Sequence, residues 1–157
     1  MHMLSQVIRR QFAPLVSMLR QTIHACPDDA FTENTIGPRE HIYHALVGMD
    51  IWLSADPAQY AFDAIVDNAA AQLDGPASDR ISREFLTDRL ARAERKVAGL
   101  PDDSESFLSI QELRGTEFTL LDRCLSQLRH VQHHIGVANE IFRSMGKPTV
   151  GWSGYGE

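Results

Sequence analysis

Two histidines on one helical face offer the clearest chemistry in this sequence. His130 and His134 are four residues apart within a long stretch of helical periodicity. Since successive residues of an α-helix turn by about 100°, the two side chains lie about 40° apart on one face. A pair with this spacing is how a helix presents two imidazoles to one metal ion. The spacing therefore predicts a divalent-metal site at His130 and His134.

A second pair of histidines, His41 and His44, lies at one margin of another apolar stripe. In helical bundles, facing helices commonly contribute one or two metal ligands each. One imidazole from this pair would complete a three-histidine site with an open position, which is typical of catalytic rather than structural zinc. The residues alone do not choose between His41 and His44. The alternative interpretation is that all these histidines are hydrogen-bonded polar residues at the edge of a core.

Two further side chains, Arg123 and Gln127, project from the same side of the last predicted helix as His130. They are candidates for contacts to the metal ligands or to a substrate. His133 lies about 100° from His134, on the side predicted to face solvent. No general acid, base or substrate clamp is evident beyond Arg123, so the pattern leaves the type of reaction open.

Four long segments with helical periodicity must position these side chains. They run from about Leu4 to Ala25, from Pro38 to about Leu53, from Ser82 to about Ala98, and from near Thr116 to Met145. Apolar residues recur in each at three- and four-residue spacing, and the connections are rich in Pro, Gly and Asp. Helices of this number bury their apolar stripes best against each other. The sequence therefore predicts an all-α fold, a four-helix bundle with short extra helical segments in its connections.

Finer expectations concern the connections and the ends of the helices. A short helix is predicted from Ala58 to Ala71, residues 74–80 are predicted to form a loop, and residues 102–115 are ambiguous. Pro14 is expected to kink the first helix or to leave one of its hydrogen bonds unmade. Trp152 and Tyr155 are expected to pack back on the bundle. The inward face of the last helix is predicted to carry Leu121, Cys124, Leu125, Leu128, Val131, Ile135, Ala138 and Phe142.

Length and composition set the class of protein. The chain has 157 residues, which fits a single domain spanning 1–157, with 43% hydrophobic and 23% charged residues. A net charge of −6 without a basic stripe argues against nucleic acid and anionic membranes as partners, and leaves a small molecule or a protein. No apolar run approaches the ~20 residues of a membrane span, and the first residues do not resemble a secretory signal. We therefore expect a cytoplasmic protein, with Cys26 and Cys124 as buried thiols.

Two segments resemble a known family. The stretch LRHVQHHIGVANEIFRSMGKPTVGW (Leu128–Trp152) is similar to the C-terminal helix signature of the DinB/YfiT-like metal-binding proteins, with two histidines four apart and a Pro–Trp-type tail. The stretch REHIYHALVGMDIWL (Arg39–Leu53) resembles that family's second-helix histidine motif. The resemblance implies that His44, His130 and His134 are the three metal ligands. It assigns no ligand role to His41 or His133.

Membership would imply a four-helix bundle, often a homodimer, with a divalent metal such as nickel or zinc on three histidines. Some relatives are thiol-dependent transferases or isomerases that present a low-molecular-weight thiol to the metal, and others have no assigned activity. The mycothiol-dependent maleylpyruvate isomerases replace one histidine by glutamate, whereas this chain has histidine at all three positions.

Two hypotheses about function follow. The first is a metal-dependent thiol transferase or isomerase, in which the metal stabilises the nucleophilic thiolate of a small-molecule cosubstrate. The second is a non-catalytic metal-binding or stress-related helical module whose metal is structural. Metal-dependent turnover with a thiol would favour the first hypothesis, and a sharp loss of thermal stability on chelation would favour the second.

Overall fold

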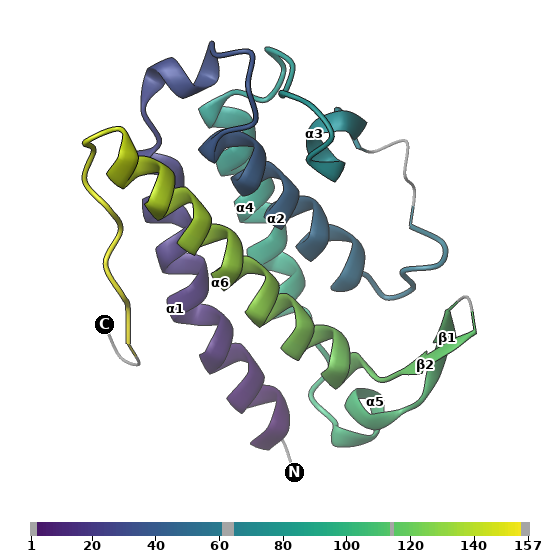
Figure 1. The fold of residues 1–157 in the computed structure, drawn as a ribbon. Helices are drawn as coiled ribbons and strands as arrows, with labels where there is room; N and C mark the ends of the chain where they lie inside the picture. The colour runs from purple at the N-terminus through teal and green to yellow at the C-terminus, as the bar shows by residue number, and fades with distance from the viewer. Residues whose placement is uncertain (1–2, 61–64, 114, 155–157) are drawn as a thin grey trace.

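The computed structural model describes residues 3–60, 65–113 and 115–154, and this part of the chain is mostly helical (Figure 1). The elements are α1 (Met3–Ala25), a 3-10 turn η1 (Asp28–Phe31), α2 (Pro38–Trp52), α3 (Asn68–Gln72), α4 (Arg83–Ala98), α5 (Ser104–Leu108), β1 (Gln111–Leu113), β2 (Thr116–Phe118) and α6 (Leu120–Ser144). The predicted all-α fold is confirmed.

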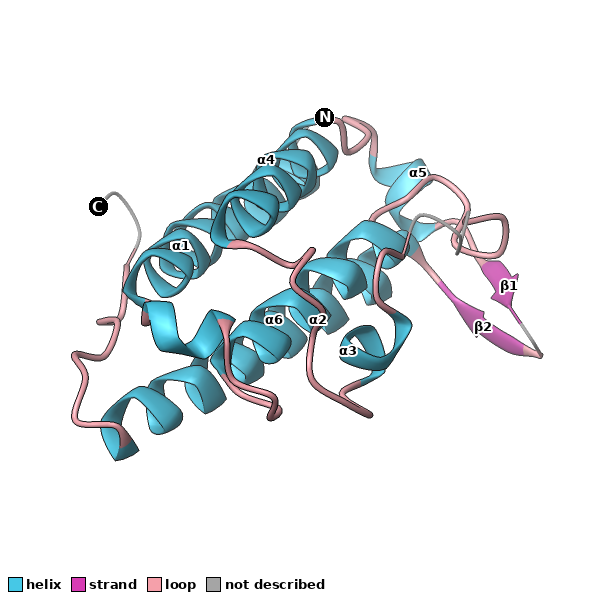
Figure 2. Ribbon diagram, turned by 90° about the horizontal axis from the view of Figure 1, so that it is seen from above, coloured by secondary structure: helices cyan, strands magenta, loops and turns pink. Residues whose placement is uncertain are grey.

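The four long helices pack side by side in two layers. Seen from above, α1 and α4 form one layer while α2 and α6 form the other (Figure 2). Helix α1 contacts both α4 and α6, and α2 contacts the same two helices, so the apolar stripes of all four meet in one core. The antiparallel strands β1 and β2 pair Gln111 with Phe118 and project beyond the start of α6. Among the described residues, no helix combines the length and the apolar character needed to cross a membrane.

The buried residues of α1 repeat with helical periodicity, as the sequence predicts. Phe12, Leu19 and Ile23 are among its fully buried side chains, and the helix continues through Pro14. Helix α4 begins after Ser82, whose hydroxyl oxygen accepts a hydrogen bond from the backbone N–H of Phe85 at 3.1 Å. This is the predicted cap.

The start of α6 differs from the prediction. Residues 116–118 form β2, and the helix begins at Leu120. Thr119 and Asp122 close a reciprocal cap, in which the Thr119 hydroxyl accepts from the backbone N–H of Asp122 at 3.1 Å and the Asp122 carboxylate accepts from the N–H of Thr119 at 2.8 Å. This cap satisfies the first helical N–H groups three residues later than the position expected at Thr116.

The connection between α2 and α4 also differs. The helix predicted over residues 58–71 is found only as the short α3, Asn68–Gln72, and residues 61–64 of the predicted range lie outside the described residues. Asp67 holds α3 in place, because its carboxylate accepts from the backbone N–H groups of Ala70 at 3.1 Å and Ser78 at 2.7 Å. Leu73 ends α3 in the left-handed conformation, with φ of 57°.

Two apolar side chains that were expected to be buried are exposed, and a third lies outside the described residues. Trp152 is 75% exposed rather than packed on the bundle, and Tyr155 lies outside the described residues. The tail is held instead at Val150, whose backbone exchanges two hydrogen bonds with the side chain of Asn139. Leu125, predicted to face inward, is 41% exposed.

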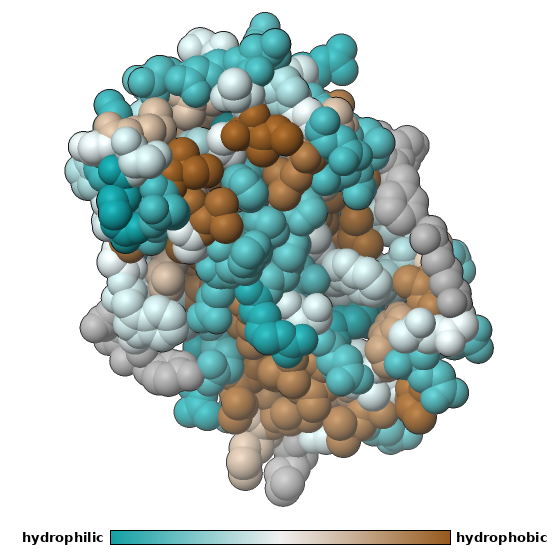
Figure 3. All heavy atoms as spheres, in the orientation of Figure 1, coloured by the Kyte–Doolittle hydropathy of each residue, from teal (hydrophilic) through white to brown (hydrophobic). Residues whose placement is uncertain are grey.

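Figure 3 shows apolar residues at the surface over the lower ends of α1 and α6.

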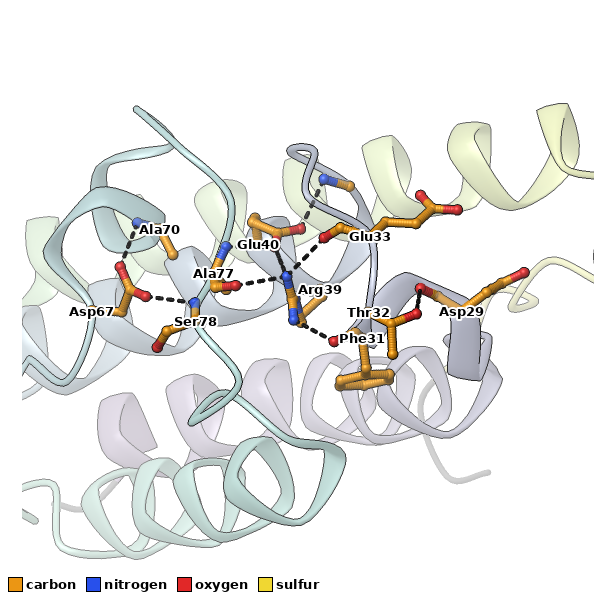
Figure 4. A network of polar contacts seen from close by, with 11 residues as sticks. Asp29, Phe31, Thr32, Glu33, Arg39, Glu40, Asp67, Ala70, Ala77 and Ser78 are labelled. Atoms are coloured by element: carbon orange, nitrogen blue, oxygen red, sulfur yellow. Dashed lines mark hydrogen bonds and ion pairs between the residues drawn. The ribbon is translucent and has the colours of Figure 1, made fainter.

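A buried ion pair secures the start of α2 (Figure 4). Arg39 and Glu40 are both fully buried, and the Arg39 Nε donates to a Glu40 carboxylate oxygen at 2.8 Å. The guanidinium also donates to the carbonyl oxygens of Phe31 at 2.7 Å and Ala77 at 2.8 Å. The Glu40 carboxylate accepts in turn from the backbone N–H of Gly37 at 2.8 Å. The connections before and after α2 are thereby fixed to its first turn, next to His41.

Candidate metal centre

Three imidazole nitrogens converge where α2 packs against α6. The Nε2 atoms of His44 and His130 lie 2.9 Å apart, and those of His130 and His134 lie 3.1 Å apart. Each of the three residues offers one nitrogen to a group that spans no more than 4.8 Å. His134 is buried, while His44 and His130 are half-buried. The structure therefore brings together the three residues that the sequence motifs single out.

Hydrogen bonds to the opposite ring nitrogens fix how two of these imidazoles are protonated. The Nδ1 of His44 lies 2.7 Å from the carbonyl oxygen of Ala71, which can only accept, so Nδ1–H is the donor. The Nδ1 of His130 lies 3.2 Å from the amide oxygen of Gln127. Since a neutral imidazole carries one proton, both Nε2 atoms then direct lone pairs at each other. Two facing lone pairs at 2.9 Å repel unless a cation lies between them.

His41 lies behind His134 rather than among the three nitrogens. The Nδ1 atoms of His41 and His134 are 3.0 Å apart, so one of them donates to the other. If His134 directs its Nε2 lone pair into the cluster, its Nδ1–H donates to His41. His41 then holds its proton on Nε2 and orients the ring of His134, the role that outer hydrogen-bond partners play at metal sites. His133 is exposed, as predicted.

Burial keeps the clustered imidazoles neutral. The pKa of His130 falls from the ordinary 6.5 to about 4, first because of burial and then because of the neighbouring His44 and His133. The pKa of His134 falls to about 3, again chiefly through burial, with His130 as the next cause. Burial also lowers the pKa of His41. At neutral pH these groups have lone pairs available for a metal ion.

Gly48 makes the close approach of α6 possible, and the sequence patterns did not single it out. A Cβ at this position would lie 2.7 Å from Cε1 of His130 and 3.0 Å from the amide oxygen of Gln127. The His130 ring therefore occupies the space that any larger side chain would need. A glycine inside a helix, four residues after His44, is the signal that could have pointed to this contact.

The two candidate neighbours of the site behave differently. Gln127 is buried and contacts His130, as described above. Arg123 is also buried, but its Nη1 donates to the carbonyl oxygen of Ser54 at 3.0 Å, beyond the end of α2. Its Nε lacks an acceptor among the residues that the structure describes.

The two cysteines lie outside this cluster. Cys26 and Cys124 are both buried and free. Burial raises the pKa of the Cys26 thiol to about 12 and that of the Cys124 thiol to about 11. Both therefore stay protonated and behave as small apolar side chains, as predicted.

The donor set and the spacing of the cluster are compatible with a metal ion. Two nitrogens bound to one tetrahedral zinc at about 2.0–2.1 Å lie about 3.3 Å apart, close to the separations found here. Comparisons with known proteins add no assignment, because no family model, curated protein or solved structure matches the chain. The resemblance to the DinB/YfiT-like family therefore stays a prediction that depends on the two sequence motifs.

Proposed function

We propose that this protein binds one divalent metal ion through the Nε2 atoms of His44, His130 and His134, and that it is a metal-dependent enzyme acting on a small molecule. The observation that supports the metal most strongly is the convergence of Nε2 atoms whose Nδ1 partners are acceptors. Neutral imidazole nitrogen suits zinc and nickel better than magnesium or calcium. Nickel or zinc is accordingly the proposed metal.

An enzyme is favoured over a structural metal module by the number of protein ligands. Among the His, Cys, Asp and Glu residues of the described chain, only these three side chains form the cluster. Three protein ligands are typical of catalytic zinc sites, whereas structural sites are closed by a fourth. The four long helices also share one apolar core that does not depend on the site. A metal is therefore not needed to supply the driving force for folding.

The family resemblance supports a thiol transferase or isomerase as the reaction class. When bound, a divalent metal would lower the pKa of a coordinated thiol and so make it nucleophilic at neutral pH. The chain itself orients the three imidazole rings. The Nδ1–H groups of His44 and His130 donate to the oxygens of Ala71 and Gln127. His134 is oriented by its contact with Nδ1 of His41. Low-molecular-weight thiols are the proposed cosubstrates.

Turnover of electrophiles with a panel of cellular thiols tests this proposal. Protein loaded with zinc or nickel should show thiol-dependent turnover that His130→Ala abolishes, with His133→Ala as the matched control on the exposed side of α6. Metal-loaded protein without turnover across a broad panel would contradict the enzymatic proposal. If chelation also unfolded that protein, the metal would be structural.

A further inference from the structure

A cavity lies at the end of the α2–α6 interface that carries the histidines. Its volume is about 650 Å³, and its walls include Ile51 and Trp52 of α2, Gln72, and Phe118 of β2. Cavities that bind small molecules are commonly about 300–1,000 Å³ and combine apolar walls with a few polar groups. Gln72 directly follows Ala71, whose carbonyl oxygen holds His44. The cavity and the metal centre therefore share both α2 and α3.

The helix faces that bound the histidine cluster continue towards this cavity. On α2, Gly48 and Ile51 follow His44 at spacings of four and seven residues, so all three share one face. On α6, Gln127 and Arg123 precede His130 by three and seven residues and share its face. A separation of seven residues along a helix is about 10 Å. The cavity wall at Ile51 thus lies about 10 Å along α2 from His44.

Two aromatic rings form part of the cavity wall, and a buried cation contacts one of them. The rings of Trp52 and Phe118 lie edge to face with centroids 6.1 Å apart. The Cζ of Arg123 lies 5.9 Å from the centre of the Phe118 ring. Arg123 is only 4% exposed, and its buried Nε is the donor without an acceptor among the described residues.

Within the part of the chain that the structure describes, no carboxylate lies close enough to Arg123 to form an ion pair with it. The neighbouring carboxylate of Asp56 is exposed and accepts from the backbone N–H of Ala58 at 2.9 Å. A buried cation with an unused donor is costly, and an anionic acceptor would remove both penalties. Burial correspondingly lowers the pKa of Arg123.

We propose that this cavity binds a small aromatic or similarly flat carboxylate, with the carboxylate on Arg123 and the apolar body against Trp52 and Phe118. Binding itself does not require the metal. The further step, that such a carboxylate is the substrate of the metal centre, rests on the proposed function.

The probe for this proposal is 3-phenylpropanoate, with the uncharged 3-phenylpropanamide as its matched control. In a Trp152→Phe background Trp52 is the remaining tryptophan, so its fluorescence reports occupancy of the cavity. We expect saturable binding of the carboxylate, with a Kd about 10-fold or more lower than that of the amide. Arg123→Gln should abolish this preference, while Arg129→Gln, at an exposed position on α6, should retain it. Absence of saturable binding, equal affinity for both probes, or a preference that survives in Arg123→Gln would each overturn the proposal.

Two measurements avoid relying on a buried substitution that could impair folding. Thr116 lines the cavity from the exposed hairpin, so Thr116→Trp should fill it and weaken binding of the carboxylate at least 10-fold. In the protein with native Arg123, the Nε–H resonance of Arg123 should shift with the carboxylate and not with the amide. Undiminished binding to Thr116→Trp, or an unmoved resonance, would contradict the proposal.

Titrations of metal-free and metal-loaded protein separate this proposal from the previous one. Carboxylate binding by a protein that binds no metal would leave the cavity proposal standing and overturn the metal centre. A protein that binds metal at the three histidines and no probe would support the metal centre and overturn the cavity proposal.

Discussion

His41 and His44 lie one turn apart on α2, yet they have different surroundings. His44 faces His130 through its Nε2, whereas His41 contacts the outer nitrogen of His134. The sequence could not separate them, because both lie at the margin of the same apolar stripe. The decisive contact to His44 is the carbonyl oxygen of Ala71, which comes from a segment 27 residues later in the chain.

This difference predicts two distinct mutant phenotypes. His44→Ala removes a proposed ligand and should abolish stoichiometric metal binding. His41→Ala removes only the partner of His134, so metal should still bind with a Kd raised by about 10- to 100-fold. His133→Ala is the control, because its side chain is exposed. Competition with a chromophoric chelator measures all three affinities, and loss of metal from His41→Ala but not His44→Ala would reverse the two roles.

Gly48 gives a second test at the level of single residues. Gly48→Ala places a methyl group 2.7 Å from Cε1 of His130, so the imidazole ring must shift from the position in which it faces His44. We expect metal affinity to fall by about 10-fold or more, as for other changes that misorient a ligand. Gly136→Ala on α6 is the matched control, since a Cβ there meets nothing within 4 Å and alanine favours the helix by up to about 1 kcal/mol. Unchanged affinity in Gly48→Ala would show that the packing of His130 does not matter.

Between elements, a buried carboxylate joins α2 to α4. Asp50 is 1% exposed and lies 2.5 Å from Nη1 of Arg89, 3.0 Å from Nε of Arg92 and 3.1 Å from Nζ of Lys96. Lys96 also donates to the Asp50 carbonyl oxygen. Three cations of α4 thus converge on one side chain of α2, on a face about 120° from His44.

Removing this carboxylate should destabilise the fold and spare the metal centre. Asp50→Asn removes the negative charge that faces the buried Arg89, and we expect a loss of about 3 kcal/mol in the free energy of unfolding. This is the low end of the cost of breaking a buried ion pair, since Arg92 and Lys96 keep partial access to water. Urea unfolding measures it, with the exposed Asp88→Asn of α4 expected within about 0.5 kcal/mol of the parent protein. A small effect for Asp50→Asn would mean that the cluster is structurally unimportant.

Element boundaries show where sequence patterns are sufficient. Periodicity predicts α1, α2 and α4 within a few residues, because each buries one continuous stripe. It fails at Thr116, because a strand of three residues is too short for its alternation to be recognised. It also fails over residues 58–71, where the short α3 depends on the tertiary contacts of Asp67 rather than on its own propensity.

On the scale of the whole molecule, the fold class follows from the sequence and the site only partly does. The four apolar stripes require helices packed on helices, and the spacing of His130 and His134 requires a shared face. The cavity at Trp52 and Phe118 could not be predicted, because the strands that bring Phe118 to Trp52 are too short to show a sequence pattern. The homodimer implied by the family resemblance stays a prediction, which light scattering can test.

Acidification should destabilise the metal-free protein between about pH 6.5 and pH 4. Burial, followed by neighbouring histidines, lowers the pKa of His130 to about 4 and that of His134 to about 3 in the folded state. In the unfolded chain both imidazoles return to about 6.5, so the unfolded state binds more protons in this range and acid favours it. Above about pH 6.5 both states hold neutral imidazoles, and this contribution to stability is constant.

Urea unfolding of the metal-free protein in the presence of a chelator measures this loss of stability. The urea midpoint should be lower at pH 5 than at pH 7. Carboxyl groups affect the stability at lower pH values than the histidines do. Partial burial raises the pKa of Asp67, but hydrogen bonds from Ser78 and Ala70 outweigh it and leave that pKa below 3.8. Its stabilising effect is therefore lost only at lower pH. Equal midpoints at pH 5 and pH 7 would be inconsistent with buried, neutral histidines.

The most direct test of the metal centre is elemental analysis of the purified, untagged protein beside His44→Ala, His130→Ala and His134→Ala. The native protein should carry one equivalent of a divalent metal, zinc or nickel, per chain. Each substitution should remove that metal while circular dichroism shows the helical fold intact. A native protein without stoichiometric metal, or a metal retained when all three histidines are replaced, would contradict the proposed metal centre.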